Sequence, residues 1–112
     1  MKFRLHLAQA VFSTNGYGYH DMNDDTVPPY VRTLDRQRRI VARHVMESII
    51  AGLHKPVVEP SEYFRATKYE ARHNGFNATV IVYPAKNSHI ADIKVYAGAV
   101  QFFYTVTAIK GV

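Results

Sequence analysis

The stretch that decides the fold is KYEARHNGFNATVIV, residues 68–82. Asn74 and Gly75 at its centre strongly favour a two-residue β-turn, because both residues tolerate a positive φ. Such a turn places His73 opposite Phe76 and sets the register of a hairpin. One face then holds Tyr69, Ala71, Ala78, Val80 and Val82, and the other holds Lys68, Glu70, Arg72, Asn77, Thr79 and Ile81. This separation supports the register, because a slip of one residue would mix the two sets.

In the C-terminal part of the chain, the residues also separate into an apolar face and a mixed face when a second turn is placed at Gly98 and Ala99. Gly then occupies the first central position, as a type II′ turn prefers. The apolar face holds Ile93, Val95, Phe102, Tyr104 and Val106, and the mixed face holds Asp92, Lys94, Tyr96, Gln101, Phe103, Thr105 and Thr107. Two independent registers therefore predict an apolar face that can be buried and a mixed face that points away from it.

An amphipathic helix is predicted before the hairpins, from Pro29 or Thr33 to about Leu53. Proline suits the first helical position, where its missing N–H has no partner. Gly52 is a candidate for the residue that ends the helix. The apolar stripe that would face the sheet consists of Leu34, Val41, Val45 and Ile49, flanked by Met46, Ile50 and Leu53.

The N-terminal segment, residues 3–12, alternates apolar and other residues and predicts a strand. Asn15 and Gly16 predict a turn, and residues 17–19 a short return strand. The expected fold is therefore α+β, with one amphipathic helix packed on a mostly antiparallel sheet of about five to six strands, order β(β)αββββ. The N-terminal strand either joins an edge of this sheet or inserts into it. We expect residues 1–112 to form a single domain.

The amino-acid composition excludes some kinds of site and favours some kinds of partner. The chain has no Cys, which excludes disulfides and thiolate metal sites. The N-terminus has no long apolar run, so we expect neither a signal peptide nor a membrane partner, and a cytoplasmic location. The net charge of +5 favours an acidic protein surface or nucleic acid as partner. No sequence pattern indicates a cofactor.

The mixed face of the sheet combines cations with aromatic rings. Rings stack on bases and cations neutralise phosphates, so this mixture suits single-stranded nucleic acid. The same residue types are enriched in protein interfaces. Alternatively, this face binds no separate partner because the N-terminal residues or a second subunit cover it. The candidate binding residues here are Lys68, Arg72, Lys94, Tyr83, Tyr96 and Phe103.

The predicted helix carries a second group of candidates. Arginines recur with helical spacing and form a stripe that we expect opposite the apolar one. Arginine binds phosphate or carboxylate with two parallel hydrogen bonds, so the stripe could hold an acidic partner. The alternative is an ordinary solvated face. These residues are Arg32, Arg36, Arg39 and Arg43, with Arg38 nearby.

Catalysis has one candidate set. Glu70 lies among cations and Arg72 is close by, so with His20 or His89 supplying an acid from a loop they could cleave RNA without a metal. A Glu between cations on a strand more commonly forms a cross-strand ion pair. Residues 21–25 resemble the opening of a calcium loop, but Thr26 and Arg32 stand where Gly and Glu are needed. We therefore expect no metal site.

The leading hypothesis is a non-catalytic interaction module. It would bind an acidic partner, either nucleic acid or a protein that handles nucleic acid, and act as an inhibitor, adaptor or accessory subunit. One alternative is a small, metal-independent ribonuclease-like enzyme that uses Glu70, Arg72 and His20. Another is a self-assembling structural subunit whose outer face and edge strands pair with copies of itself.

Overall fold

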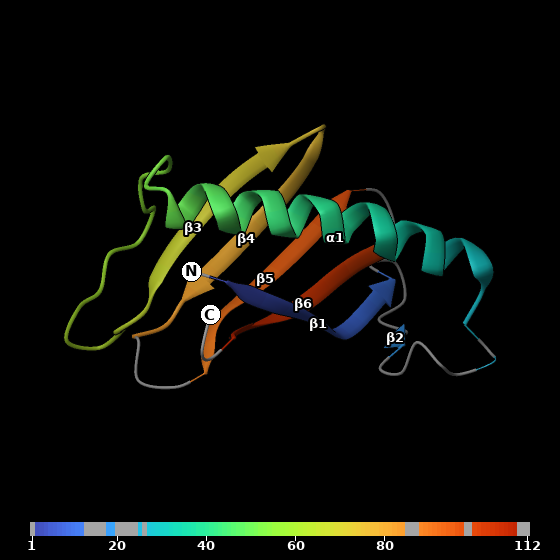
Figure 1. The fold of residues 1–112 in the computed structure, drawn as a ribbon, viewed down its shortest axis with the longest axis horizontal. Coiled ribbons are helices and arrows are strands. Elements are labelled where there is room, and N and C mark those ends of the chain that lie inside the picture. Colours follow the sequence, from blue (N-terminus) through green and yellow to red (C-terminus); the bar gives the residue numbers. More distant parts are fainter. Residues whose placement is uncertain are drawn as a thin grey trace.

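The structure is a computed structural model that describes residues 2–12, 18–19, 25, 27–84, 88–97 and 100–109. The chain forms strands β1 (Phe3–Phe12) and β2 (Gly18–Tyr19), helix α1 (Pro29–Ile50), and strands β3 (Thr67–His73), β4 (Phe76–Val82), β5 (His89–Ala97) and β6 (Val100–Ala108). Helix α1 lies across one face of the sheet (Figure 1). The predicted α+β fold is therefore confirmed. The turns predicted at Asn15–Gly16 and Gly98–Ala99 lie outside the described residues.

The sheet is six-stranded, with the order β2-β1-β6-β5-β4-β3. Every neighbouring pair is antiparallel. Strand β1 pairs with β6, so the N-terminal strand extends the four-stranded meander at its β6 edge and does not insert into it. This pairing puts the first and last long strands side by side near the centre of the sheet.

Both predicted hairpin registers are confirmed. His73 lies opposite Phe76, with Asn74 at φ 50° and Gly75 at φ 82° in the turn between them. Ala97 lies opposite Val100 in the second hairpin. The residues predicted for the apolar face point towards α1, where Ala78, Val80, Ile93, Val95, Phe102, Tyr104 and Val106 are buried.

Helix α1 ends at Ile50, earlier than the predicted Leu53. The N–H of Gly52 donates to Ile49 O and the N–H of Leu53 donates to Ser48 O, both at 3.0 Å. Gly52 has φ 76°, so these two bonds form a Schellman motif in which Gly52 terminates the helix as expected. No helix in the described part of the chain has a stretch long and apolar enough to cross a membrane.

The buried face of α1 contains most of the predicted stripe, with Val41, Val45, Met46 and Ile49 in the core. Arg38 is also buried, with only 4% of its surface exposed. Its guanidinium lies over the Phe76 ring at 4.4 Å and near the Phe102 ring at 5.9 Å. Burial of the guanidinium lowers the pKa of Arg38. Arg38 therefore belongs to the helix–sheet core and not to the arginine stripe.

Polar contacts also tie α1 to the sheet, through a group that we call the helix clamp: Asp35, Arg39 and Tyr104. The Tyr104 hydroxyl donates to Asp35 Oδ1 at 2.6 Å and approaches Asp35 O at 3.1 Å. Arg39 lies 3.5 Å from the Asp35 carboxylate and donates to Leu5 O at 3.1 Å. Burial, followed by the bond to Asp35, raises the pKa of Tyr104.

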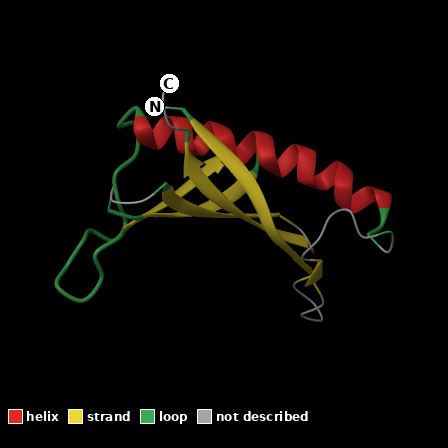
Figure 2. Cartoon of the chain, turned by 60° about the horizontal axis from the view of Figure 1, so that its bottom comes forward, coloured by secondary structure: helices red, strands yellow, loops and turns green. Residues whose placement is uncertain are grey.

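The connection between α1 and β3 is long and projects beyond the sheet (Figure 2). Val57 N–H donates to Lys68 O at 2.8 Å and Lys68 N–H donates to Val58 O at 2.9 Å, so this connection pairs with the edge of β3. A turn closed by a 2.7 Å bond from Ser61 N–H to Phe64 O follows, and Tyr63 within it is 94% exposed.

Candidate binding face

The sheet face opposite α1, which we call the outer face, is open. In the described ranges, no helix or strand packs on it (Figure 2). Its side chains on β5 and β6 are half-exposed, whereas their neighbours along each strand are buried under α1. Residues 3–12 do not cover this face, because they form β1 and are part of the sheet.

Strand register arranges the outer face in rows that run across the sheet. The Phe103 row consists of Glu70, Thr79, Lys94, Phe103 and Gln9. The Asp92 row consists of Lys68, Ile81, Asp92, Thr105 and His6. Residues in one row are direct cross-strand neighbours, so their side chains interact at short range.

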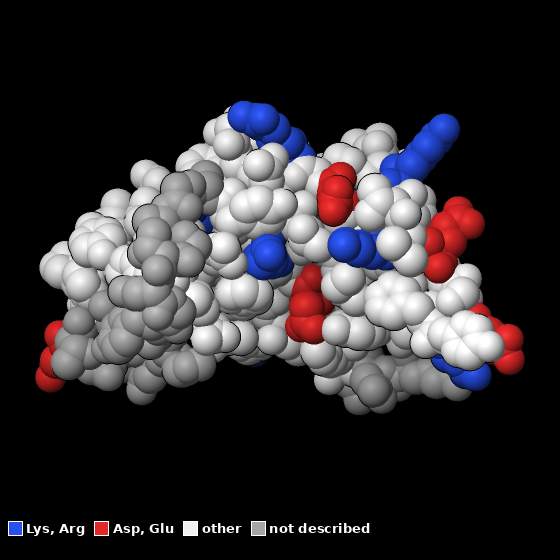
Figure 3. Space-filling model, turned by 180° about the vertical axis from the view of Figure 1, so that it is seen from behind, with Lys and Arg blue, Asp and Glu red and all other residues white. Residues whose placement is uncertain are grey.

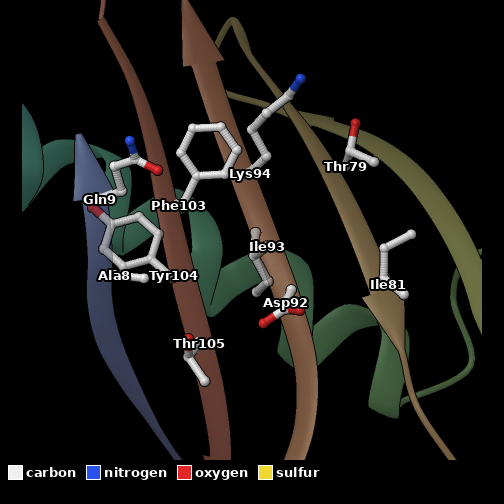
Figure 4. Close-up of a pocket in the computed structure, with 10 residues that line it drawn as sticks. All are labelled: Ala8, Gln9, Thr79, Ile81, Asp92, Ile93, Lys94, Phe103, Tyr104 and Thr105. Atoms are coloured by element: carbon white, nitrogen blue, oxygen red, sulfur yellow. The ribbon is translucent and has the colours of Figure 1, made fainter. Parts of the chain in front are cut away.

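A hollow of about 430 Å³ lies between these two rows (Figure 4). Its volume falls in the range of small-ligand pockets, about 300–1,000 Å³. A register shift between Leu7 and Gln9 disturbs the pairing of β1 with β6 beside the hollow. The Phe103 ring and the Lys94 side chain lie next to each other at one end. The hollow is lined by Ala8, Gln9, Thr79, Ile81, Asp92, Ile93, Lys94, Phe103, Tyr104 and Thr105.

Three of the predicted binding residues lie together. Lys94 is directly opposite Phe103, and Lys94 Nζ lies 5.0 Å from the centre of the Tyr96 ring. Lys68 and Arg72 are on the edge strand β3, separated from this group by β4. Figure 3 shows acidic and basic side chains interspersed over this side of the molecule. The outer face is therefore a mixed surface with one aromatic and cationic centre.

The arginine stripe is divided between sheet and solvent. Arg39 belongs to the helix clamp, and the Arg43 guanidinium lies 4.9 Å from the Phe3 ring centre. Arg36 is exposed, and Arg32 is half-buried. The expectation that all four side chains lie opposite the apolar stripe is therefore wrong for Arg39, whereas Arg43 is exposed and only its guanidinium lies near β1. The long side chain of Arg39 reaches back to β1, on which its methylenes can pack.

A cluster that the sequence analysis did not identify surrounds Asp92. His89 Nε2 lies 2.8 Å from Asp92 Oδ1, and the Tyr83 hydroxyl donates to Asp92 Oδ2 at 2.6 Å. The bond to Asp92, with smaller effects of burial and charge, raises the pKa of Tyr83 to about 12. Residues three apart in a regular strand face opposite sides, but a register shift between His89 and Ala91 brings His89 to the side of Asp92.

A second histidine lies across β6 from this cluster. His6 Nε2 is 3.2 Å from Thr107 Oγ1, and Thr107 is directly opposite both Arg4 and His89. Two imidazoles and an arginine thus surround the threonines of β6. We call this group the histidine block: Arg4, His6, His89, Asp92, Thr105 and Thr107.

The predicted catalytic set is not assembled in the described residues. Glu70 lies 3.9 Å from Lys68, which is two residues away on the same strand, so this ion pair lies within β3 and is not the expected cross-strand pair. His73, next to Arg72, faces α1 and stacks on His44 with ring centres 3.7 Å apart. His20 and residues 21–24 lie outside the described residues. Within the described ranges, no three His, Asp or Glu side chains are placed to hold a metal ion.

Comparison with protein-family models, with curated protein sequences and with solved structures gives no match to this chain. The functional assignment therefore depends on the geometry of the outer face.

Proposed function

We propose that the protein is an interaction module that binds single-stranded nucleic acid across the outer face. The observation that supports this most is the pair of Phe103 and Lys94, side by side at the wall of a hollow in an uncovered sheet. A base stacked on such a ring contributes about 1–3 kcal/mol. The adjacent ammonium group neutralises a phosphate of the same strand.

The neighbouring row extends this contact surface. Tyr96 lies two residues along β5 from Lys94, about 7 Å away, and the register places Asn77 and Gln101 on either side of it. Rings on central strands of an open antiparallel sheet are the arrangement by which sheet-based modules bind unpaired RNA. The strand would therefore run from the hollow over Tyr96, with Arg72 available to a phosphate at the sheet edge.

The proposed role is that of an inhibitor, adaptor or accessory subunit in the cytoplasm. Glu70 and Asp92 interrupt the cations of the outer face, so attraction to the phosphate backbone is moderate and stacking supplies more of the affinity. An acidic protein surface is the competing partner, and it would use the same hollow to hold an anchoring side chain.

The test is fluorescence anisotropy with labelled single-stranded oligonucleotides at several salt concentrations. Phe103→Ala should weaken binding about 5- to 150-fold, the equivalent of one lost stacking contact. Lys94→Gln should weaken binding and reduce the slope of log affinity against log salt by nearly one unit. Tyr63→Ala removes an exposed ring from the projecting connection and should leave binding unchanged.

Two results would overturn this proposal. One is binding that does not change with salt, and the other is equal affinity of the Phe103→Ala variant. Capture of an acidic protein that depends on Phe103, without oligonucleotide binding, would assign the outer face to a protein partner and exclude the nucleic acid.

A further inference from the structure

The histidine block has features that simple binding does not require. The Asp92 carboxylate only accepts hydrogen bonds, so His89 Nε2, 2.8 Å away, must carry the proton. In the neutral ring, the lone pair is then on Nδ1, which makes that atom a proton acceptor. The hydroxyl of Tyr83 fixes Asp92 from its other oxygen. His89 is therefore a base whose tautomer and orientation are set by its neighbours.

The second imidazole lies on the opposite side of the same threonines. Strands β5 and β1 both flank β6, and His89 lies opposite Thr107 whereas His6 lies opposite Thr105. The two backbone positions are therefore about 12 Å apart, twice the strand spacing across the sheet and two residues along it. Both side chains are exposed and on the outer face. A phosphate placed over Thr105 and Thr107 would lie between the two rings, with Arg4 directly beside Thr107.

The block and the hollow are continuous. Asp92 and Thr105 belong to the block and also line the hollow. A strand whose base stacks on Phe103 therefore has a backbone that passes the histidines. This continuity joins the two parts of the outer face into one surface.

We infer that the histidine block cleaves RNA by transesterification without a metal ion, an inference that rests on the proposed binding of single-stranded nucleic acid. His89 takes the proton of a 2′-hydroxyl, and that oxygen forms a bond to the adjacent phosphorus. The bond from phosphorus to O5′ breaks, and protonated His6 donates a proton to O5′. The products are a 2′,3′-cyclic phosphate and a 5′-hydroxyl, so no other reactant is needed.

The remaining members of the block have supporting roles. Arg4 and the threonine hydroxyls bind the phosphate oxygens, whose charge increases as the new bond forms. Asp92 is a positioning residue, because it acts on the substrate only through His89. This assignment replaces Glu70, Arg72 and His20 as the residues of a ribonuclease-like activity.

The test uses a DNA oligonucleotide that contains a single ribonucleotide, with EDTA present. The wild type should cut it at that nucleotide, and mass spectrometry should show the cyclic phosphate. His89→Ala and His6→Ala should each lower the rate about 10²- to 10⁴-fold, the usual contribution of one general acid or base. His44→Ala, on α1 across the sheet, is the matched control and should cut normally.

The positioning role of Asp92 is tested by a kinetic measurement that a purely structural residue would not affect. Asp92→Asn should lower kcat with little change in KM, because the substrate contacts the histidines and Phe103. Asp92→Glu should restore part of the rate. Circular dichroism checks the fold of each variant, and Gln replaces Ala at either histidine if the Ala variant does not fold.

Failure of this inference is distinguishable from failure of the proposed function. The same oligonucleotide made entirely of deoxynucleotides has no 2′-hydroxyl and reports binding alone. Binding of this DNA without cleavage of the ribonucleotide version would overturn the cleavage site and leave the proposed function standing. Absence of binding would overturn both. Cleavage that EDTA abolishes, or that survives loss of both histidines, would also refute the assignment.

Discussion

The helix clamp makes a quantitative prediction for Tyr104→Phe. The substitution removes one oxygen, and with it the 2.6 Å bond to the Asp35 carboxylate. A hydrogen bond to a charged group contributes about 1.5–3 kcal/mol to stability. In the variant, the Asp35 carboxylate keeps its contact with Arg39 and its side chain is 15% exposed, so its charge is not buried without a partner. The expected loss in the free energy of unfolding is therefore about 1.5–3 kcal/mol.

For a chain of 112 residues, this loss lowers Tm by about 6–13 °C. Urea titration followed by circular dichroism measures the free energy, and an unchanged m-value shows that the unfolding reaction is the same. Tyr96→Phe, which removes the same oxygen on the outer face, should change stability by less than about 0.5 kcal/mol. A Tyr104→Phe variant within that limit would show that the clamp does not hold α1 to the sheet.

Three other predictions test different parts of the structure. Tyr83 should ionise near pH 12 in an ultraviolet titration, and Asp92→Asn should return its pKa towards 10.0. The hydrogen bond to Asp92 stabilises the neutral phenol, so its contribution to the free energy of unfolding is complete below pH 10 and is lost between pH 10 and 12. Gly52→Ala should destabilise the fold by about 1–2 kcal/mol in a urea titration, because φ is 76° there; an unchanged midpoint would contradict the Schellman end. Val80→Ala should cost about 2–4 kcal/mol by the same assay, because Val80 has no exposed surface, whereas Ile81→Val on the outer face should cost less than about 1 kcal/mol.

The hairpins could be predicted because the constraints are local. Asn74 and Gly75 fix the turn, and the period of two then assigns every side chain of β3 and β4 to a face. The same reasoning placed Lys94, Tyr96 and Phe103 on the uncovered side. The partner of β1 could not be predicted, because its apolar alternation fits either edge of the meander.

The histidine block could not be found from the sequence, for a specific reason. Regular alternation places His89 and Asp92 on opposite faces, and only the register shift next to Ile90 brings them together. No glycine occurs between His89 and Ala91 to signal such an irregularity. His6 contacts Thr107 across 101 positions of sequence, and that contact depends on the pairing of β1 with β6.

The arginines of α1 show a limit of the helical pattern. The period of the apolar residues gives the buried side of a helix but not the reach of the long side chains beside it. Arg38 enters the core because Phe76 and Phe102 present ring faces to its guanidinium. Arg39 and Arg43 reach the rings of Tyr104 and Phe3 in a similar way.

The pairing of Val58 with Lys68 has a consequence for the behaviour of the protein at high concentration. Strand β3 is the last of its sheet, and every second backbone group along such a strand points outwards, where another chain could pair with it. The connection from α1 occupies the position at Lys68, and Glu70 and Arg72 are charged and exposed at the next two. The paired connection blocks one position and charged side chains flank the next two, so this edge resists fibril-like growth.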